Sequence, residues 1–397
     1  MTRAEIFLAR GEDARLRAGH LWAFSNEIDT ARSPLTSFAP GELVNLFDAK
    51  GQGIGTGYVN PHSLIAVRLL ASEVDVAIDR SFFQERIRRA IDTRAHFGLA
   101  RFSRMVFGEG DRLPGLVVDR YGPHLVVQVG TAGMESLREL IQGALIECFA
   151  PEGILYRNDL EARKLEGLDQ RTSEVWGTVP ERVTVEEAGL AFQVSPRHGQ
   201  KTGWFYDQRE HRTRVARLCV GRRLLDVFSY VGGFSLTALA QGAREAVAVD
   251  ESEAALSLAI ENAEANQLEV PRTIVADAFD ALRMLAESGE RFEVIVLDPP
   301  AFIKRKKDFR QGLLAYERLV GLAARLLVNP GFLVLASCSS HLGVDDFRGA
   351  FARGVRRAGR AAKIVDTGGQ GPDHPIHPSI PETSYLKVLY GLIEESK

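Results

Sequence analysis

The chain has 397 residues, of which 45% are hydrophobic and 25% are charged. This composition excludes an intrinsically disordered chain, and the length predicts two or three domains rather than one. The formal net charge of −3 excludes a uniformly basic nucleic-acid-coating protein, although an RNA partner that contacts a local basic surface stays compatible with it.

Residues 1–72 are predicted to form a small β barrel. Residues 43–47 form a short apolar run that is interrupted only by Asn45. An Asp/Gly-rich turn at 48–53 then leads into the apolar run 54–59, which indicates a hairpin. A further strand is expected at 63–70. These short strands and tight turns define the first expected domain.

Residues 73–195 are predicted to form an α+β domain. Apolar residues recur at helical spacing over 79–98, and a second helix is expected over 134–149. Strands are expected at 104–107, 115–122 and 124–129. The many arginines between Arg80 and Arg104 are interpreted as a solvated helix face. No function for this domain can be inferred from its sequence.

Residues 196–397 alternate between strands and helices, which is typical of a parallel sheet covered on both faces. The expected strands are 223–227, 246–250, 273–277, 292–298 and 331–336. The fold class is therefore α/β. It comprises a C-terminal doubly wound, Rossmann-like sheet preceded by a small β barrel and an α+β central domain.

A glycine-containing turn follows the first strand of this sheet, over Asp226–Phe234. A dinucleotide site would carry GxGxxG to seat a pyrophosphate, whereas only Gly232 and Gly233 are present here. Asp226 instead suits an ammonium-bearing amino acid, Asp250 suits ribose hydroxyls, and Asp277 suits an adenine amino group. One such acid is more often a turn former, but three at successive strand ends predict S-adenosylmethionine.

Asp298 and Cys338 are expected to face a common pocket, because they follow the neighbouring fourth and fifth strands. A cysteine is often only a buried packing residue, and we interpret Cys148 and Cys219 in that way. The position of Cys338 leaves both interpretations open. A thiolate that adds to C6 of cytosine makes C5 nucleophilic, while an acid at N3 takes up the electron density.

The chain resembles the family of large-subunit ribosomal RNA cytosine-5 methyltransferases. Members of this family carry an N-terminal PUA domain, a central α+β domain and a class I methyltransferase domain. The most specific matches are Lys201–Arg209, the turn Asp226–Phe234 and Ser337–Cys338–Ser339. Further matches lie at 15–26, 110–121, 298–302, 373–378 and 385–387.

The resemblance implies roles for individual residues. Cys338 is the expected nucleophile, Asp298 is the expected acid, and S-adenosyl-L-methionine is the cofactor. The expected cofactor-binding residues are Asp226, Phe228, Ser229, Gly232, Asp250, Asp277, Asp207 and Gln208. The PUA-like region implies docking on large-subunit ribosomal RNA, and Lys304–Arg310 is expected where the substrate strand passes. The target base has to be unpaired or flipped out of its helix.

One position departs from the pattern of related enzymes. Many RNA cytosine-5 methyltransferases outside this family place a second cysteine where this chain has Pro300. The base that removes the C5 proton is therefore not identified, and His341 is only a weak candidate. Two alternatives stay open: a guanine-directed ribosomal RNA methyltransferase and a non-catalytic RNA-binding ribosome-assembly factor. A nicotinamide dehydrogenase is disfavoured by the missing GxGxxG.

The expected location is the cytoplasm. No apolar run approaches the roughly 20 residues that span a bilayer, so no membrane partner is expected. The start of the chain, Met1–Glu5, becomes acidic at once and does not resemble a signal peptide. The three cysteines form no closely spaced pair, so neither a disulfide framework nor a metal is expected. The oligomeric state stays open between a monomer and a homodimer.

Overall fold

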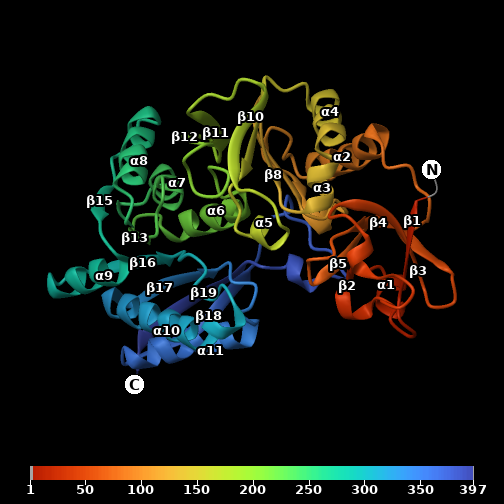
Figure 1. Cartoon of the computed structure of the whole chain (residues 1–397). Coiled ribbons are helices and arrows are strands. Elements are labelled where there is room, and N and C mark those ends of the chain that lie inside the picture. The colour runs from red at the N-terminus through yellow and green to blue at the C-terminus, as the bar shows by residue number, and fades with distance from the viewer. Residues whose placement is uncertain (1–2, 397) are drawn as a thin grey trace. The chain divides into compact units, whose positions relative to one another are not determined.

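The computed structural model describes residues 3–396, apart from the side chain of residue 174. The chain forms two compact units (Figure 1). The N-terminal unit comprises Met1–Val183, Ser195–Tyr206 and Pro372–Thr383, and the C-terminal unit comprises Thr184–Val194, Asp207–Gly371 and Ser384–Lys397. This division follows contacts rather than sequence order, so the domain boundaries expected after residues 72 and 195 stay predictions.

The N-terminal unit begins with a five-stranded sheet in the order β1-β3-β4-β5-β2. Its strands are β1 (Ala4–Phe7), β2 (Trp22–Phe24), β3 (Glu42–Phe47), β4 (Gly53–Val59) and β5 (Ile65–Ala71), with the short helix α1 (Ala14–Arg17) after β1. Backbone bonds from Ala9 to Glu27 and from Asp29 to Phe7, both 2.8 Å, join the two edges. The sheet therefore closes around its apolar side chains into the expected small barrel.

A second sheet in this unit has the order β10-β9-β8-β7-β6. Its strands are β6 (Phe102–Phe107), β7 (Leu116–Tyr121), β8 (His124–Val129), β9 (Gly153–Asn158) and β10 (Arg171–Gly177). The helices of this region are α2 (Arg80–Ala95), α3 (Ala132–Ser136), α4 (Arg138–Phe149) and α5 (Ala162–Leu165). Phe83 and Ile87 of α2 and Ile141 of α4 share one core with Val118 and Val127 of the sheet.

Two expectations for this region are wrong. The single helix expected over 134–149 is broken at Leu137, where the backbone has φ −97° and ψ 8°. The Ser136 hydroxyl lies 2.8 Å from the Gly133 carbonyl, and such local side-chain bonds compete with a continuous helix. The solvated face expected for the arginines is present at Arg80, Arg88 and Arg89, which are exposed. The expectation is wrong for Arg94 and Arg104, because each is buried in an ion pair, with Asp111 and with Asp119.

The C-terminal unit contains a seven-stranded sheet in the order β15-β14-β13-β16-β17-β19-β18. Its strands are β13 (Arg223–Val227), β14 (Glu245–Asp250), β15 (Arg272–Val275), β16 (Phe292–Leu297), β17 (Leu327–Ser337), β18 (Arg360–Gly368) and β19 (Lys387–Glu395). Its helices are α6 (Arg209–Leu218), α7 (Gly233–Ala240), α8 (Glu253–Ala265), α9 (Ala278–Glu287), α10 (Phe309–Leu326) and α11 (Val344–Arg357). The five expected strands are all present and mutually parallel, whereas β19 runs antiparallel to β17. A separate hairpin is formed by β11 (Val183–Glu187) and β12 (Leu190–Val194).

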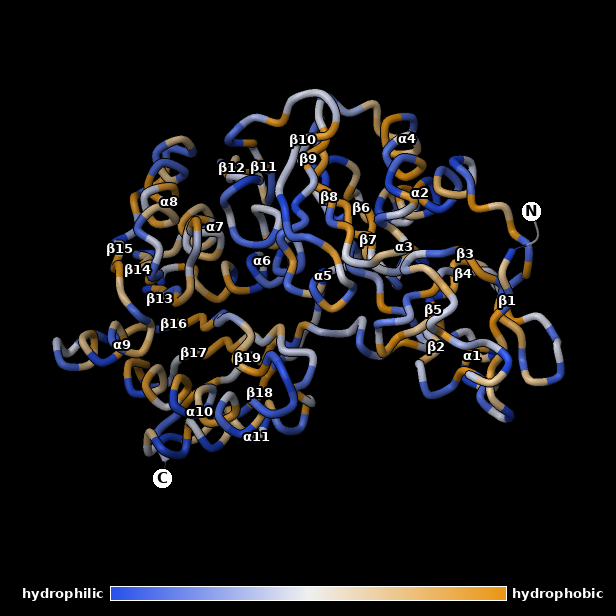
Figure 2. The backbone as a smooth tube through the Cα atoms, viewed as in Figure 1, coloured by the Kyte–Doolittle hydropathy of each residue, from blue (hydrophilic) through white to orange (hydrophobic). Residues whose placement is uncertain are grey.

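The central strands of this sheet are buried on both faces, as the expected doubly wound fold requires, whereas most residues of the edge strand β18 are exposed. Successive strand residues alternate between two cores: Leu225 and Leu297 pack with α9, α10 and α11, whereas Leu224 and Val296 pack with α6 and α7. The apolar stretches along β16 and β17 are visible in Figure 2. The strand order reverses between β13 and β16, and ligands of such sheets bind at the carboxyl ends of the strands at this point.

Candidate active site

The turn after β13 has an unusual backbone. Phe228 and Tyr230 both have positive φ, at 67° and 51°. Non-glycine residues in this conformation cost free energy and concentrate at functional sites. Gly232 also has positive φ, at 81°, and a Cβ there would lie 3.1 Å from the Ala259 Cβ, so glycine suits the position. The backbone amides of Phe228 and Ser229 donate to the Val249 carbonyl of β14, which fixes the turn at the sheet edge.

Asp226 is completely buried beneath this turn. Its Oδ2 accepts from the Ser235 backbone amide at 3.0 Å and from the Ser235 hydroxyl at 2.8 Å, which anchors the start of α7. Burial raises the pKa of Asp226 to about 7, because the charged carboxylate loses its hydration. Within residues 3–396, Asp226 Oδ1 and the buried Ser229 hydroxyl have no hydrogen-bond partner.

Asp250 and Asp277 also have local structural roles. The Asp250 carboxylate accepts from the Tyr230 amide and the Ser252 amide, each at 2.9 Å, so it joins the turn after β13 to the turn after β14. Asp277 caps α9 by accepting from the backbone amides of Phe279 and Asp280. Each acid therefore stabilises its turn whether or not it also contacts a ligand. Their cofactor roles stay predictions.

Gln208 and Asp298 are in direct contact. Gln208 Nε2 donates to Asp298 Oδ1 at 2.9 Å, and the Asp298 backbone amide donates to the Val227 carbonyl of β13. Gln208 was expected among the cofactor contacts, but no motif in the sequence indicates its bond to Asp298. Asp207 Oδ2 accepts from the Tyr385 hydroxyl at 2.5 Å. The buried pair Asp207–Gln208 therefore connects the tip of β16 with the segment that enters β19.

Cys338 lies in a turn that several side chains hold in place. The Tyr316 hydroxyl of α10 is 2.8 Å from the Ser337 hydroxyl and 3.3 Å from the Ser339 hydroxyl. The Ile303 amide, on the loop after Asp298, donates to the Ser339 hydroxyl, so the two loops touch. The strands before them are hydrogen-bonded neighbours, with Leu297 opposite Leu335. The predicted proximity of the two strand tips is thus confirmed, whereas the shared pocket stays a prediction.

The three cysteines differ in their surroundings. Cys219 is completely buried, and burial raises its pKa to about 12. Cys148 is half-buried against the core of the N-terminal unit, and burial again raises its pKa. Cys338 is half-exposed at a strand end, between two buried serines. Cys148 and Cys338 are exposed to a similar degree, but Cys148 lies within helix α4, so Cys338 is the one cysteine of the three that lies in a turn at a strand end.

The remaining sequence candidates lie on exposed loops. His341 and Pro300 are solvent-exposed, as is the basic run Lys304–Lys307. Arg305 pairs with Asp308 at 3.3 Å, and the rest of the run is open to solvent. Neither Tyr316 nor Lys387, which donates to the Ser339 carbonyl at 2.9 Å, was identified from the sequence as part of the site.

The polar atoms at this edge suit S-adenosylmethionine. Asp226 Oδ1, the Ser229 hydroxyl and Gln208 Oε1 are buried, and the described part of the chain offers them no hydrogen-bond partner. Such atoms are rare in folded proteins, since each costs free energy unless a ligand or water satisfies it. A carboxylate, a hydroxyl and an amide oxygen are suitable acceptors for the ammonium and hydroxyl groups of an amino acid joined to a nucleoside.

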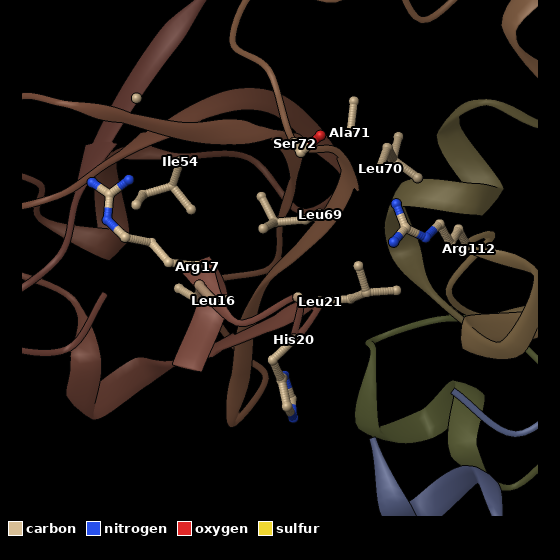
Figure 3. Close-up of a pocket in the computed structure, with 12 residues that line it drawn as sticks. Leu16, Arg17, His20, Leu21, Ile54, Leu69, Leu70, Ala71, Ser72 and Arg112 are labelled. Atoms are coloured by element: carbon tan, nitrogen blue, oxygen red, sulfur yellow. The ribbon is translucent and has the colours of Figure 1, made fainter. Parts of the chain in front are cut away.

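A separate pocket lies on the barrel of the N-terminal unit (Figure 3). It has a volume of about 280 Å³, and Figure 3 shows Arg17 and Arg112 on opposite sides of it. Arg17 is paired with Asp13 and Asp48. Arg112 also lines an adjoining polar pocket with Arg86 and Arg89, and within the described chain it has no ion-pair partner. Glu73 and Glu85 also line the polar pocket, and Glu85 pairs with Arg89, so the protein neutralises the positive charge of this surface only in part.

Two protein-family models match the chain. A PUA-like domain matches residues 6–72, and an S-adenosylmethionine-dependent methyltransferase matches residues 156–376. The N-terminal barrel is therefore PUA-like, and the seven-stranded sheet is part of an S-adenosylmethionine-dependent methyltransferase domain. Among residues 3–396, no helix is both long and apolar enough to cross a membrane.

Curated relatives and solved structures agree with these matches. Ribosomal RNA large subunit methyltransferase I of Aeromonas salmonicida is 37% identical over 391 residues, which cover 97% of this chain and 98% of the relative. The protein of the same name from Aliivibrio fischeri is 35% identical and covers 96% and 97%. A Streptococcus mutans protein provisionally assigned as an S-adenosylmethionine-dependent methyltransferase has the same fold, with a TM-score of 0.82, 20% identity, and coverage of 98% of this chain and 100% of its own. A similarly assigned methyltransferase, solved in complex with SAH, gives a TM-score of 0.83 at 20% identity and covers 99% and 100%.

Proposed function

Since the chain belongs to the ribosomal RNA large subunit methyltransferase I family, we propose that it forms 5-methylcytosine in large-subunit ribosomal RNA, with Cys338 as nucleophile. The observation that supports the cytosine-5 product is the half-exposed Cys338 in a fixed turn at the carboxyl end of β17, next to the loop that carries Asp298. A nitrogen or oxygen target would be nucleophilic by itself and would need no thiol.

The reaction begins with a thiolate. Cys338 Sγ forms a bond to C6 of the cytosine, and the electrons of the C5–C6 double bond move toward C4 and N3. Asp298, held by Gln208, donates a proton or hydrogen bond to N3, which stabilises the negative charge that develops there. C5 of the adduct is now an enamine carbon and can attack an electrophile.

S-adenosylmethionine supplies an electrophilic methyl group on its sulfonium sulfur when it is bound. A base then removes the C5 proton, and the electrons of that bond expel the Cys338 thiolate and restore the C5–C6 double bond. His341 is a weak candidate for this base, because it lies on an exposed loop. The thiol is regenerated, so each turnover consumes one methyl donor and releases one proton.

We assign the cofactor to the turns after β13, β14 and β15. Asp226 and Ser229 have buried oxygens suited to the ammonium group, while Phe228 and Gly232 shape the turn. Asp250 would accept from ribose hydroxyls and Asp277 from the adenine amino group; Asp207 and Gln208 would close the site from the other side of Asp298. An Asp226 that ionises beside a bound ammonium would form a buried charge pair.

We further propose that the PUA-like barrel docks ribosomal RNA. The pocket between Arg17 and Arg112 and its polar neighbour with Arg86 and Arg89 offer cations for phosphate groups. The net charge of −3 for the whole chain does not oppose this role, because phosphate contacts need only a local group of cations such as Arg86 and Arg112. Ribosomal RNA as a substrate agrees with the cytoplasmic location expected from the sequence. The oligomeric state stays open between a monomer and a homodimer.

The covalent step gives the decisive experiment. The full chain is incubated with S-adenosylmethionine and ribosomal RNA from cells that lack it, and mass mapping locates the methylated nucleotide. RNA with 5-fluorocytosine at that nucleotide should then form a persistent protein–RNA adduct on a denaturing gel, because fluorine cannot leave as a cation. Cys338→Ala should abolish the adduct and methyl transfer but retain affinity for S-adenosylhomocysteine.

Two controls make the result specific. Cys148→Ala and Cys219→Ala should keep both the adduct and methyl transfer, since their side chains pack against cores. Substantial methyl transfer by Cys338→Ala would refute the cytosine-5 product and favour a guanine-directed enzyme. Failure of the unmodified protein to transfer methyl to naked or assembled ribosomal RNA would favour a non-catalytic assembly factor.

A further inference from the structure

Lys387 lies directly beside the turn that carries Cys338. It is the first residue of β19, and in the antiparallel pairing of β19 with β17 it is opposite Ser337. Its place in the sequence, far beyond Cys338, gives no hint of this contact. The strand register therefore brings an ammonium group to the same strand end as the proposed nucleophile.

Two hydrogen bonds fix the ammonium group. Lys387 Nζ donates to the Ser339 carbonyl at 2.9 Å and to the Tyr385 carbonyl at 3.0 Å. Both acceptors are neutral, and in the described chain Lys387 forms no salt bridge with a carboxylate. The side chain is half-buried, so solvent screens its charge less than that of a surface lysine. A fixed positive charge thus sits at the backbone on the C-terminal side of Cys338.

The charges of the two side chains interact. Burial lowers the pKa of Lys387, and the negative charge of an ionised Cys338 acts in the opposite direction and raises it. Such an interaction is mutual, since a thiolate that favours the ammonium is itself favoured by it. The ordinary pKa of a cysteine thiol is about 8.5, so only a few per cent would be thiolate at neutral pH without such help.

We propose that Lys387 stabilises the Cys338 thiolate and thereby supplies the nucleophile at neutral pH. Lys387 acts through Cys338 and through the turn that it holds, so it is a positioning residue for the proposed reaction. The proposal explains how a half-exposed thiol becomes reactive although it follows a strand rather than beginning a helix, where a dipole would assist it.

Other groups face the same turn and contribute to any pH profile. Asp298 begins the loop after β16, and the Ile303 amide of the same loop donates to the Ser339 hydroxyl of the Cys338 turn. Tyr316 of α10 bonds the flanking serines and stays neutral, since burial raises its pKa. Tyr385 is bonded to Asp207, and His341 follows in the exposed loop. Lys387 is the one cation among them whose hydrogen bonds reach the Cys338 turn.

Ionisation of Cys338 can be measured without turnover. The full chain is treated with iodoacetamide from about pH 5.5 to about 9.5, and mass spectrometry of the Cys338 peptide gives the alkylation rate at each pH. Lys387→Met should move the midpoint of this profile upward by about one pH unit, the effect expected for loss of a nearby opposite charge. Alkylation at neutral pH should then slow about tenfold, and Lys387→Arg should largely restore the wild-type midpoint.

Lys363→Met is the matched control, because Lys363 lies on the adjacent strand β18 and pairs with Glu394 at the surface. Its midpoint should equal that of the wild type. An unshifted midpoint in Lys387→Met would overturn the proposal, as would equal shifts in both variants. The proposal rests on the thiolate chemistry above, but alkylation does not need the methyl reaction, so the two can fail separately.

A second measurement covers a Lys387→Met variant that fails to fold. In the wild-type chain with ¹³C-labelled lysine, the titration of the Lys387 Cε signal should show a higher pKa than in Cys338→Ala. Both proteins retain Lys387, and Cys338→Ala removes only the thiolate that raises its pKa. Identical titrations in the two proteins would show that the charges do not interact and would refute the proposal.

Discussion

Two kinds of buried carboxylate occur in the molecule, one closed by a guanidinium and one partly open; the closed kind is present in both units, since Arg212 of the C-terminal unit donates to both oxygens of Glu187. In the N-terminal unit, Arg94 donates to both oxygens of Asp111, and Arg104 donates to both oxygens of Asp119. These pairs are closed, with each carboxylate oxygen bound to a guanidinium. In the C-terminal unit, the buried Asp226 has one oxygen bound to Ser235 and the other without a partner in the described chain.

The difference separates buried carboxylates that are paired within the protein and stabilise the fold from a buried carboxylate, Asp226, that has an oxygen available for a ligand. A buried pair contributes mainly specificity, because the loss of hydration offsets most of its attraction, and removal of one partner is then strongly destabilising. A buried oxygen without a partner costs free energy that a ligand can recover. Substitutions in the first group should therefore change stability, and substitutions in the second should change binding or rate.

Among the substitutions that leave Cys338 in place, Asp298→Asn should give the largest effect on activity. An amide cannot protonate N3, so methyl transfer should fall by at least about 10²-fold, within the range of general acid catalysis. The bond from Gln208 can persist, because the amide oxygen still accepts from Nε2. Single-turnover methyl transfer at saturating RNA measures the effect. Asp308→Asn, on the same loop, should retain the wild-type rate, and an equal loss there would indicate general loop damage.

Arg94→Met should give the largest effect on stability. It leaves the buried Asp111 carboxylate without its partner and removes a bond to the Asp373 carbonyl, which should cost about 3–5 kcal/mol of unfolding free energy. Denaturant unfolding measures this cost. Arg89→Met on the same helix breaks only the exposed pair with Glu85 and should cost less than about 1 kcal/mol. Affinity for S-adenosylhomocysteine should be unchanged in both folded variants, and a weaker affinity would contradict the comparison.

The sequence predicts those features of the fold and of the candidate site that are determined by short segments of the chain. The five parallel strands follow from apolar runs of strand length, and the turn after β13 follows from its glycines and Asp226. The neighbouring positions of Asp298 and Cys338 follow from the order of strands in a doubly wound sheet. These features need only short segments and a known topology.

Long-range pairing is what the sequence does not predict. Lys387 reaches the turn that carries Cys338 through the register of an antiparallel strand that the sequence did not indicate, and Gln208 reaches Asp298 across 90 positions. The buried state of Arg94 depends on Asp111 and on a carbonyl 279 positions away. An arginine-rich stretch favours a solvated helix face when these partners are unknown. The helix itself is therefore predicted correctly, and only the burial of Arg94 by its distant partners is missed.

The raised pKa of Asp226 makes cofactor binding depend on pH. In the free protein the carboxyl has a pKa of about 7, above its ordinary value, so its contribution to stability is greatest at low pH and is lost as the pH rises through 7. A bound ammonium group favours the ionised form. Affinity for S-adenosylhomocysteine should therefore increase about five- to tenfold from about pH 6 to about pH 7.5, as titration calorimetry can measure. Asp226→Asn should bind with little pH dependence, and an unchanged slope in that variant would assign the proton to another group.

The smallest effect is expected at the barrel. There, the proposed contacts are between arginines at the surface and RNA phosphates, and solvent and salt screen them. The Arg112 guanidinium lines two pockets. Burial, and to a smaller extent the charges of Arg112 and Arg89, lower the pKa of Arg86 to about 10, while Glu85 and Glu73 act in the opposite direction. Arg112→Glu should weaken binding of a ribosomal RNA fragment about three- to tenfold at low salt, because it removes one cation that neutralises a phosphate and introduces repulsion.

The salt dependence of the weakened binding separates a direct phosphate interaction from a general charge effect. The slope of log affinity against log salt should become shallower by about 0.9 for each phosphate that the variant no longer neutralises, as fluorescence anisotropy can measure. Arg88→Glu changes the net charge equally on α2 but lies outside both pockets, so it should alter affinity and slope much less. If both substitutions changed the affinity and the salt slope equally, RNA binding would depend only on the net charge of the protein. The docking surface would then have to lie elsewhere on the chain. Methyl transfer at saturating RNA should stay unchanged in both variants, because neither arginine belongs to the C-terminal unit that carries Cys338.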